Sequence, residues 1–282
     1  INDFEYGAVY REAPPESGPG SGSRHIGDLL DQTFLSSSFE GYDVVVHLGG
    51  RTGGGQLESP ADFVSGNVET TANVLRAAQD AGVKRVVVAS SYEAYGVPST
   101  TPIEETHPLA PTTPYGITMQ MREALSQTLG HAYGIDTFVT RFFSVFGQPV
   151  TEHNRKGAIA SFVRRLQNDE ELTLMGQTST LRDYVYVADV VRCLMACIGA
   201  GSSGSQTINV GSGDGCSLDR IVKALEGHFN DLRVSHTPAA AGAKEYDVVA
   251  STDAMRDVLG FQCQYNVESG ISEMLESKGG AR

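Results

Sequence analysis

The sequence lacks tryptophan, has only four cysteines and is poor in basic residues. Its 282 residues carry 21 Lys and Arg against 34 Asp and Glu, which gives a formal net charge of −13. A protein of that charge repels phosphate polyanions, so we expect no nucleic-acid partner and no binding to an anionic membrane. No run of 18 apolar residues occurs, and the sequence therefore predicts no transmembrane helix.

The four cysteines do not form a metal-binding pattern. Cys193 and Cys197 lie four residues apart in the apolar stretch VVRCLMACIGA. A metal site would need two further ligands close by, and none follow. We therefore expect buried helix cysteines and no metal. Scattered cysteines of this kind are typical of a reducing compartment, which predicts a cytoplasmic location.

Short apolar runs alternate with longer segments of helical spacing. The runs at 43–48, 85–90 and 136–143 are typical of strands buried on both faces. The segments at 60–81 and 114–133 have apolar residues at helical spacing. This alternation predicts an α/β fold with a doubly wound parallel sheet.

The pattern becomes less regular after residue 150, where we expect a smaller mixed α/β region interleaved with the sheet. The Pro-, Gly- and Ser-rich residues 11–24 are expected to form an exposed loop. The elements expected in the second half are helices at 157–168, 187–199, 217–229 and 267–277, with strands near 172–175 and 207–210.

Ligands in open parallel sheets bind beyond the carboxyl ends of the strands. Polar or glycine-rich segments follow three predicted strands, at 47–50, 90–96 and 142–147. Ser91 ends one strand and Tyr115 begins a helix, so their hydroxyl groups can meet over the sheet. Such a pair suits proton transfer to or from an alcohol or a sugar hydroxyl. The alternative is a helix-capping serine beside a half-buried tyrosine.

Several segments between residues 25 and 277 follow one another in a familiar order. They are IGDLLD (26–31), DVVVHLGG (43–50), NVETTANVLRAA (67–78), GVKRVVVASSYEAYG (82–96), PIEETHPLAPTTPYG (102–116), RFFSVFGQ (141–148), LRDYVYVADV (181–190), INVGSG (208–213), LGF (259–261) and ESGI (268–271). Together they resemble the extended short-chain dehydrogenase/reductases, in the branch of NAD-dependent nucleotide-sugar epimerases and dehydratases.

The resemblance implies a Rossmann-like dinucleotide-binding domain over 1–150 and a mainly substrate-binding region over 151–282. It also implies tightly bound NAD, a nucleotide-sugar-like substrate, and a homodimer formed through the helices at 60–81 and 114–133. The residues it places at the cofactor are Asp28, Leu29, Leu48, Gly49, Gly50, Asn67, Ser90, Tyr115 and Phe142.

The resemblance assigns proton transfer to Ser91 and Tyr115. Glu93 lies where sugar dehydratases of the family keep a base that removes a proton beside a transient keto group. A surface or cofactor-contacting glutamate is the alternative. Arg182 matches an arginine that binds the nucleotide diphosphate, with an exposed structural arginine as the alternative, and Ser144 lies in the substrate-binding motif.

Three features depart from the family pattern. The Gly-rich phosphate loop that opens these proteins is missing, and we expect the sequence to be a truncated form that lacks the first strand–helix unit. Met119 replaces the lysine that holds the nicotinamide ribose and lowers the tyrosine pKa. Arg122, one turn further along the same helical face, is a candidate for part of that role. On the substrate side, Ser144 replaces an asparagine and residues 240–242 replace an Arg-Pro-Gly motif.

The leading hypothesis is an NAD-dependent nucleotide-sugar epimerase or dehydratase. Two alternatives stay open because Met119 replaces the lysine. One is a family member that works as an isomerase or cyclase without hydride transfer. The other is a catalytically impaired binding or regulatory member.

Overall fold

The computed structural model describes residues 6–10, 24–52, 59–147, 157–239 and 245–276. The chain divides into two compact units whose segments alternate along the sequence. Unit 1 comprises residues 1–96, 109–141 and 197–208, and unit 2 comprises 97–108, 142–196 and 209–282. The assignment of cofactor and substrate roles to 1–150 and 151–282 stays a prediction. The loop expected at 11–24 lies outside the described residues, except for Arg24.

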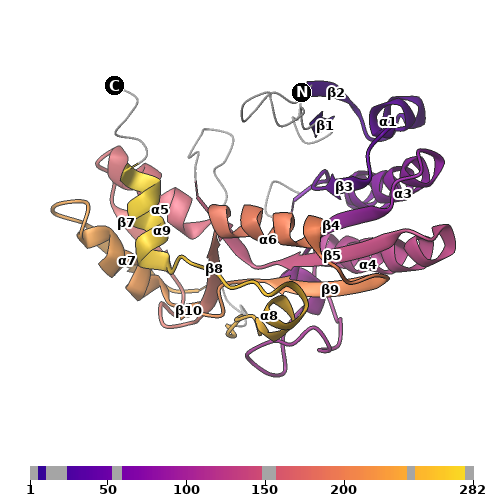
Figure 1. Ribbon diagram of the computed structural model, residues 1–282. Helices are drawn as coiled ribbons and strands as arrows, with labels where there is room; N and C mark the ends of the chain where they lie inside the picture. The colour runs from indigo at the N-terminus through magenta and orange to yellow at the C-terminus, as the bar shows by residue number, and fades with distance from the viewer. Residues whose placement is uncertain (1–5, 11–23, 53–58, 148–156, 240–244, 277–282) are drawn as a thin grey trace. The chain divides into compact units, whose positions relative to one another are not determined.

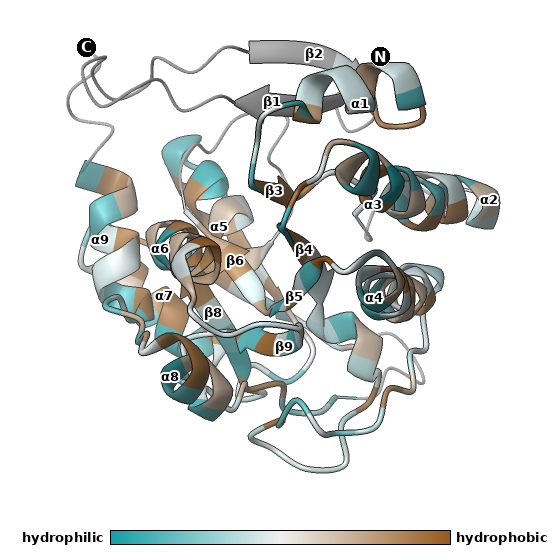
Figure 2. Cartoon of the chain, turned by 45° about the vertical axis from the view of Figure 1, so that its right-hand side comes forward, coloured by the Kyte–Doolittle hydropathy of each residue, from teal (hydrophilic) through white to brown (hydrophobic). Residues whose placement is uncertain are grey.

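Unit 1 is built around a four-stranded sheet with the order β3, β4, β5, β9 (Figure 1). These strands are β3 (Val44–His47), β4 (Arg85–Ser91), β5 (Asp136–Phe142) and β9 (Ser205–Val210), and the last two residues of β9 belong to unit 2. β3 and β4 pair in parallel, with Val44 opposite Arg85. Both strands are rich in valine, whose branched side chains favour strands, and they are drawn as hydrophobic in Figure 2. The predicted α/β class with parallel strands is confirmed.

Two strands that precede this sheet in the sequence form a separate sheet. β1 (Tyr6–Tyr10) and β2 (Arg24–Asp28) form a separate antiparallel pair. Neither strand was among the predicted elements, because an isolated antiparallel pair depends on contacts between distant segments. Helix α1 (Gln32–Phe39) was also not predicted; its N-cap Asp31 accepts hydrogen bonds from the amides of Thr33 and Phe34.

Helix α4 (Pro114–Tyr133) has the predicted bounds. Thr113 is its N-cap, and the Thr113 hydroxyl accepts a hydrogen bond of 2.9 Å from the Gly116 amide. Proline suits the first helical position because it has no amide hydrogen to satisfy. Gly134 ends the helix with φ of 68°, a left-handed conformation that costs glycine little.

The predicted helix at 60–81 contains a π-helical section. It consists of α2 (Pro60–Phe63), the π-helix η1 (Val64–Glu69) and α3 (Thr70–Asp80). At the end of η1, the Thr70 amide bonds the Ser65 carbonyl, one residue further back than in an α-helix. π-Helical turns are rare and occur often at functional sites. This one places Asn67, which is fully buried, toward the interior of unit 1.

The core of unit 1 lies between the first strands of the sheet and the helices α1 and α3. α1 and α3 pack against each other, and α3 packs against α4 (Figure 1). Buried members of this core include Leu35, Val45, Val74, Leu75 and Val86. Removing such apolar side chains from water contributes about 25 cal/mol per Å² of buried surface.

Unit 2 contains two small sheets and five helices within its described residues. β8 (Arg182–Tyr186) pairs in parallel with β6 (Ser144–Phe146) and antiparallel with β10 (Gly215–Cys216). β7 (Leu172–Met175) pairs in parallel with β11 (Val234–Thr237). The helices are α5 (Ala158–Gln167), α6 (Val187–Gly199, which ends in unit 1), α7 (Leu218–Glu226), α8 (Asp253–Leu259) and α9 (Val267–Glu276).

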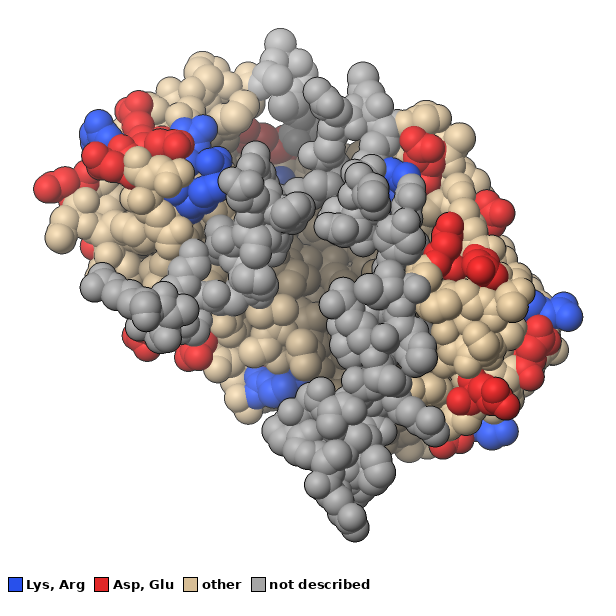
Figure 3. All heavy atoms as spheres, turned by 90° about the horizontal axis from the view of Figure 1, so that it is seen from above, with Lys and Arg blue, Asp and Glu red and all other residues tan. Residues whose placement is uncertain are grey.

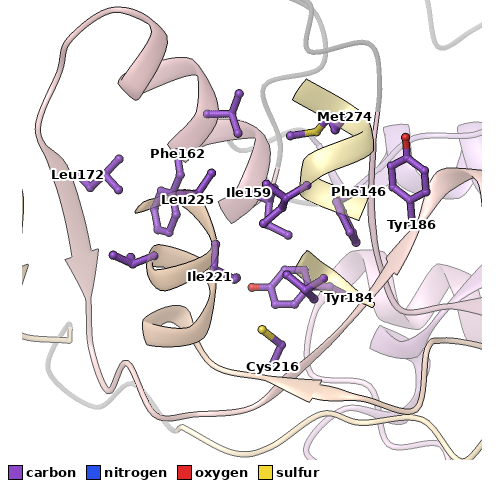
Figure 4. Close-up of a cluster of buried hydrophobic side chains, with 14 of the residues drawn as sticks. Phe146, Ile159, Phe162, Leu172, Tyr184, Tyr186, Cys216, Ile221, Leu225 and Met274 are labelled. Atoms are coloured by element: carbon purple, nitrogen blue, oxygen red, sulfur yellow. The ribbon is translucent and has the colours of Figure 1, made fainter. Parts of the chain in front are cut away.

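The core of unit 2 is a single hydrophobic cluster. Figure 4 shows side chains from α5, α7, α9, β6, β7 and β8 that point toward one another, among them Phe146, Ile159, Leu225 and Met274. The strands at 172–175 and 207–210 and all four helices predicted here are present. The short strands β6, β8, β10 and β11 and helix α8 were not predicted.

Charged side chains lie over the described surface of both units. On the face in Figure 3, basic side chains occur among acidic ones, and the described part of that face carries no continuous basic surface. No helix among the described residues is long and apolar enough to cross a membrane.

Candidate active site

The end of β4 and the start of α4 bring two hydroxyl groups together in unit 1. Ser91 is the last residue of β4, and its side chain is buried. Tyr115 lies in the first turn of α4, and its hydroxyl is hydrogen-bonded to that of Ser91. Gly116 permits the start of α4 to approach Glu93 closely, because a Cβ at position 116 would lie 2.5 Å from the Glu93 carbonyl oxygen. The structure thus joins the predicted pair, whose catalytic role stays a prediction.

Glu93 lies beside this pair in the short 3₁₀-helix η2 (Tyr92–Tyr95). Its Oε2 accepts a hydrogen bond of 3.0 Å from the Thr113 hydroxyl, and its amide donates to the Ser91 hydroxyl at 3.2 Å. Burial raises the pKa of the Glu93 carboxyl, and the Thr113 hydrogen bond lowers it in part. Glu93 is therefore a half-buried carboxyl held next to a proton-transfer pair.

Four influences act on the acidity of Tyr115. Burial raises the pKa of the phenol, and the hydrogen bond with Ser91 lowers it. The negative charge of Glu93 raises this pKa, and the positive charge of Arg122 lowers it. The net direction is upward, so the site holds a protonated Tyr115 at neutral pH.

Thr113 is a residue that the sequence analysis missed, although a threonine directly before a helix-starting proline is a typical N-cap. Thr113→Val removes both the cap and the hydrogen bond to Glu93, so we expect it to lower the free energy of unfolding by about 1 kcal/mol. Thr113→Ser keeps the hydroxyl and should stay near the wild-type stability. Urea unfolding curves measure both variants, and equal destabilisation by the two would contradict the capping role.

The predicted cofactor residues after β3 form a tight group with Asn67. Gly50 has φ of 146°, and a Cβ there would lie 2.6 Å from Asn67 Oδ1. Asn67 Oδ1 accepts from the Arg51 amide at 2.7 Å, and its Nδ2 donates to the Thr118 hydroxyl at 3.0 Å. Asn67 thereby links the segment after β3 to α4. Leu48, the first residue of that segment, is 56% exposed.

A cavity of about 160 Å³ lies in unit 1 near the same segment. Asp28, Leu29, Arg51 and Gly66 are among its lining residues. A Cβ on Gly49 would lie 2.4 Å from Leu29 Cδ1, so Gly49 also borders this group. The cavity brings together Asp28 and Leu29, two residues that the sequence analysis assigned to the cofactor.

The Ser90 side chain contacts a different set of residues from those that line the cavity. Its hydroxyl hydrogen-bonds Oε1 of Glu123, and Arg141 forms an ion pair of 2.7 Å with Oε2 of the same carboxylate. Arg141 Nη1 also donates to the Tyr95 hydroxyl at 2.8 Å. The Ser90 side chain therefore belongs to a buried polar network between β4, α4 and β5, and its hydroxyl is occupied by that network.

Two departures from the expected pattern lie further along α4. Met119 is buried, one turn after Tyr115. Arg122 follows on the same helix and is also buried, with its guanidinium bonded to residues of β3, β4 and α3 and to Gly49 after β3.

The predicted substrate residues belong to unit 2. Ser144 is half-buried at the start of β6. Phe142, which was predicted at the cofactor, also belongs to unit 2 and is half-buried at the end of β5. Arg182 stacks its guanidinium over the Tyr246 ring at 5.4 Å, and its Nη1 donates to the carbonyls of Leu181 and Tyr246. Within the described residues no hydrogen bond of its Nε or Nη2 is found. No group of three potential metal ligands occurs in the described parts of the chain.

A family model matches residues 7–211 of this sequence, and its description is "NAD dependent epimerase/dehydratase family". The chain belongs to this family. The match contains β3, β4, Ser91, Glu93 and Tyr115, so the resemblance predicted from the sequence is confirmed.

Curated relatives and solved structures agree with this assignment. The UDP-glucuronate 4-epimerase of Thermodesulfobacterium geofontis is 32% identical over 203 residues, which cover 71% of this chain and 61% of that protein. The UDP-glucose 4-epimerase of Azospirillum brasilense is 28% identical over 301 residues, covering 96% and 81%. This chain spans about three fifths of the length of the first of these epimerases.

Among solved structures, the UDP-glucose 4-epimerase of Brucella ovis in complex with NAD has a TM-score of 0.81 at 26% identity. The match covers 90% of this chain and 84% of that one. MoeE5 in complex with UDP-glucuronic acid and NAD has a TM-score of 0.80 at 26% identity, over 91% and 85% of the two chains. The predicted Rossmann-like fold of this epimerase family is thereby confirmed.

Proposed function

We propose that this protein is an NAD-dependent epimerase that acts on a nucleotide sugar, with Ser91 and Tyr115 as its proton-transfer pair. The observation that carries the proposal is the hydrogen bond between these two hydroxyl groups at the end of β4, inside the segment matched by the family model. Similarity to UDP-sugar 4-epimerases supports a uridine diphosphate sugar as the substrate class.

The residues of unit 1 fit a dinucleotide. The cavity lined by Asp28 and Leu29 provides an acceptor carboxylate beside apolar surface, which suits an adenosine. Gly49 and Gly50 have no side chains, which lets Leu29 and Asn67 pack directly against the segment after β3. These residues would hold NAD, together with Leu48 and Asn67, and bound NAD supplies a reversible hydride acceptor for a sugar carbon.

The chain's own groups would move the hydroxyl proton. Tyr115 in its anionic form accepts the proton of the reacting sugar hydroxyl, and Ser91 donates a hydrogen bond that stabilises the phenolate. For the opposite configuration to form, the oxidised sugar would have to present its other face before its carbon is reduced again, and the same pair would then return the proton to the sugar oxygen. Because Tyr115 has a raised pKa, it is protonated at neutral pH when not engaged, and only a small fraction is in the accepting phenolate form.

Glu93 decides between two outcomes in this proposal. A half-buried carboxylate with a raised pKa can remove a carbon-bound proton, which leads to dehydration, or it can orient a substrate hydroxyl, which leaves epimerisation as the outcome. The Thr113 hydrogen bond occupies one carboxylate oxygen and favours the orienting role.

Arg182 would bind the diphosphate of the substrate through its guanidinium, since arginine suits phosphate oxygens. The homodimer through the helices at 60–81 and 114–133 and the cytoplasmic location stay predictions.

A second candidate function rests on Met119. A buried methionine cannot hold a ribose hydroxyl or supply a charge, which favours an isomerase or cyclase without hydride transfer, or a binding member of the family. The presence of both hydroxyls and of Arg182 favours the first proposal.

The experiment is a proton NMR assay of the protein with NAD and either UDP-glucose or UDP-glucuronic acid. We expect the C4 epimer of at least one substrate to form, and Ser91→Ala to slow its formation. A 4-keto-6-deoxy sugar as product would assign the dehydratase role to Glu93 instead. If neither product forms while the protein still binds the UDP-sugar, the second candidate is favoured.

A further inference from the structure

Tyr95, the last residue of η2 in unit 1, is fully buried. Its hydroxyl accepts a hydrogen bond of 2.8 Å from Nη1 of Arg141. The Arg141 guanidinium also lies over the Tyr95 ring, 4.7 Å from the ring centre, at a distance typical of a cation–π contact. The polar and the aromatic part of this side chain therefore both contact one cation of β5.

Arg141 is itself held in place by Glu123 of α4. Its Nε donates to the two carboxylate oxygens of Glu123 at 3.0 and 3.1 Å, and its Nη2 donates to Oε2 at 2.7 Å. The Glu123 and Arg141 side chains are 2% and 6% exposed, so both charges are shielded from water. Charge-assisted hydrogen bonds of this kind fix the orientation of a guanidinium. The cation that contacts Tyr95 is therefore an oriented group between α4 and β5.

The same ion pair contacts the residue at the other end of this segment. Ser90 lies near the end of β4, and its hydroxyl donates to Oε1 of Glu123. The segment from Ser90 to Tyr95 is thus held at its start by the anion of the pair and at its end by the cation.

Ser91 and Glu93 of the candidate active site lie between these two contacts. The Glu93 amide donates to the Ser91 hydroxyl at 3.2 Å, which is a bond within the segment. The Thr113 hydroxyl donates to the Glu93 carboxylate at 3.0 Å, which joins the segment to the N-terminus of α4. The contacts of Ser90 and Tyr95 reach further, to the middle of α4 and to β5.

We propose that Ser90 and Tyr95 are positioning residues, which tie the segment between them to the buried ion pair of α4 and β5. They thereby hold Ser91 and Glu93 in place against the start of α4, and they act through the backbone of this segment. Such placement matters because a displacement of about 1 Å can lower a reaction rate by roughly 10²-fold. The meaning for catalysis rests on the proposed function, whereas the placement of Ser91 is a property of the chain alone.

The first test measures the contact between Ser91 and Tyr115 in the protein without ligands. The protein is labelled with [¹³Cζ]-tyrosine, and the Tyr115 resonance is identified as the one missing in Tyr115→Phe. The chemical shift of this carbon depends on the hydrogen bonding of the hydroxyl, and Ser91→Ala gives its value without the Ser91 bond. Tyr95→Phe keeps the ring and the ion pair, and it should move the Tyr115 resonance toward the Ser91→Ala value.

Tyr133→Phe is the matched control. Tyr133 packs against the core of unit 1 at the last position of α4. It lies about 27 Å along the helix from Tyr115, at a rise of 1.5 Å per residue. Loss of its hydroxyl should leave the Tyr115 resonance where it is in the wild type. Ser90→Ala removes the contact at the other end of the segment and should move the resonance in the same direction as Tyr95→Phe.

Steady-state kinetics with the UDP-sugar provide the second measurement. The kcat of Tyr95→Phe should fall by roughly tenfold to 10²-fold, because Ser91 is displaced from the reacting hydroxyl. The KM should stay near the wild-type value, because the predicted substrate-binding residues of unit 2 are unchanged. Rates are compared per folded protein, with the folded fraction taken from circular dichroism.

A Tyr115 resonance at the wild-type position in folded Tyr95→Phe would overturn the proposal. If Tyr95→Phe does not fold, an unchanged resonance in Ser90→Ala has the same meaning. An equal shift in Tyr133→Phe would also overturn it, because the loss of any tyrosine hydroxyl would then suffice. A moved resonance with wild-type kcat would contradict the positioning role. A wild-type protein that forms no epimer contradicts the proposed function only, because the comparison of resonances needs no substrate.

Discussion

Replacing Tyr115 with phenylalanine is expected to lower kcat by roughly 10²- to 10⁴-fold, the range that a general acid–base group contributes. The variant keeps the ring, its contact with Phe63 and the first turn of α4, so it should fold normally. It removes only the hydroxyl that is hydrogen-bonded to Ser91. The measurement is the rate of sugar epimerisation in the variant and in the wild type at saturating substrate.

The pH dependence provides a check on this role. Tyr115 accepts a proton only as the phenolate, and its pKa is raised, so the active fraction is small at neutral pH. Below that pKa the fraction rises tenfold with each pH unit, and kcat/KM of the wild type should rise with the same slope. The residual rate of Tyr115→Phe should lack this slope. A variant that retains wild-type kcat, or the same pH profile, would contradict the Ser91–Tyr115 mechanism.

Glu123→Gln is expected to cost about 3 to 5 kcal/mol of unfolding free energy. The Glu123 and Arg141 side chains are 2% and 6% exposed, so the substitution leaves a buried guanidinium without its anion. The same carboxylate accepts the Ser90 hydroxyl, and glutamine offers only one oxygen to replace two. Urea unfolding of the wild type and the variant gives the difference in stability.

Two control variants separate charge burial from other causes. Asp80→Asn breaks an exposed ion pair: the Arg76 side chain is 60% exposed and the Asp80 side chain 47%. This substitution should cost at most about 1 kcal/mol of unfolding free energy. The double variant Glu123→Gln, Arg141→Met removes both buried charges and should regain part of the loss. If Glu123→Gln costs no more than Asp80→Asn, the buried pair does not hold β4, α4 and β5 together.

Local sequence signals predicted the elements that have clear ends. The bounds of α4 follow from signals at its own ends: the Thr113 hydroxyl caps the first turn, and Pro114 and Gly134 act through their backbones. α1 was missed because it is short and contains three serines, which are weak helix formers. The π-helix η1 has no such signal, since its apolar residues fit an ordinary helix. Asn67 of this π-helix forms hydrogen bonds with Arg51 and Thr118, which are 16 and 51 residues away in the sequence.

The part of the candidate site that depends on the order of strands and helices was also predictable from local sequence signals. Ser91 and Tyr115 come together because one ends a strand and the other starts the helix that packs on it, a relation that the order of elements already contains. The surroundings of Arg122 come from Thr71, Ala89, His47 and Gly49, which are 33 to 75 residues away in the sequence. Ser90 was assigned to the cofactor by its position after β4, and its hydroxyl instead faces Glu123 on α4.

The most direct test of the proposed function is the cofactor content of the purified protein. The purified protein is denatured, the supernatant is assayed for released NAD or NADH, and the stripped protein is then titrated with NAD. We expect bound or rebound NAD at micromolar strength, with weaker binding after Gly50→Val, which fills the space beside Asn67. No NAD in either assay would contradict the account and would favour a family member that works without hydride transfer.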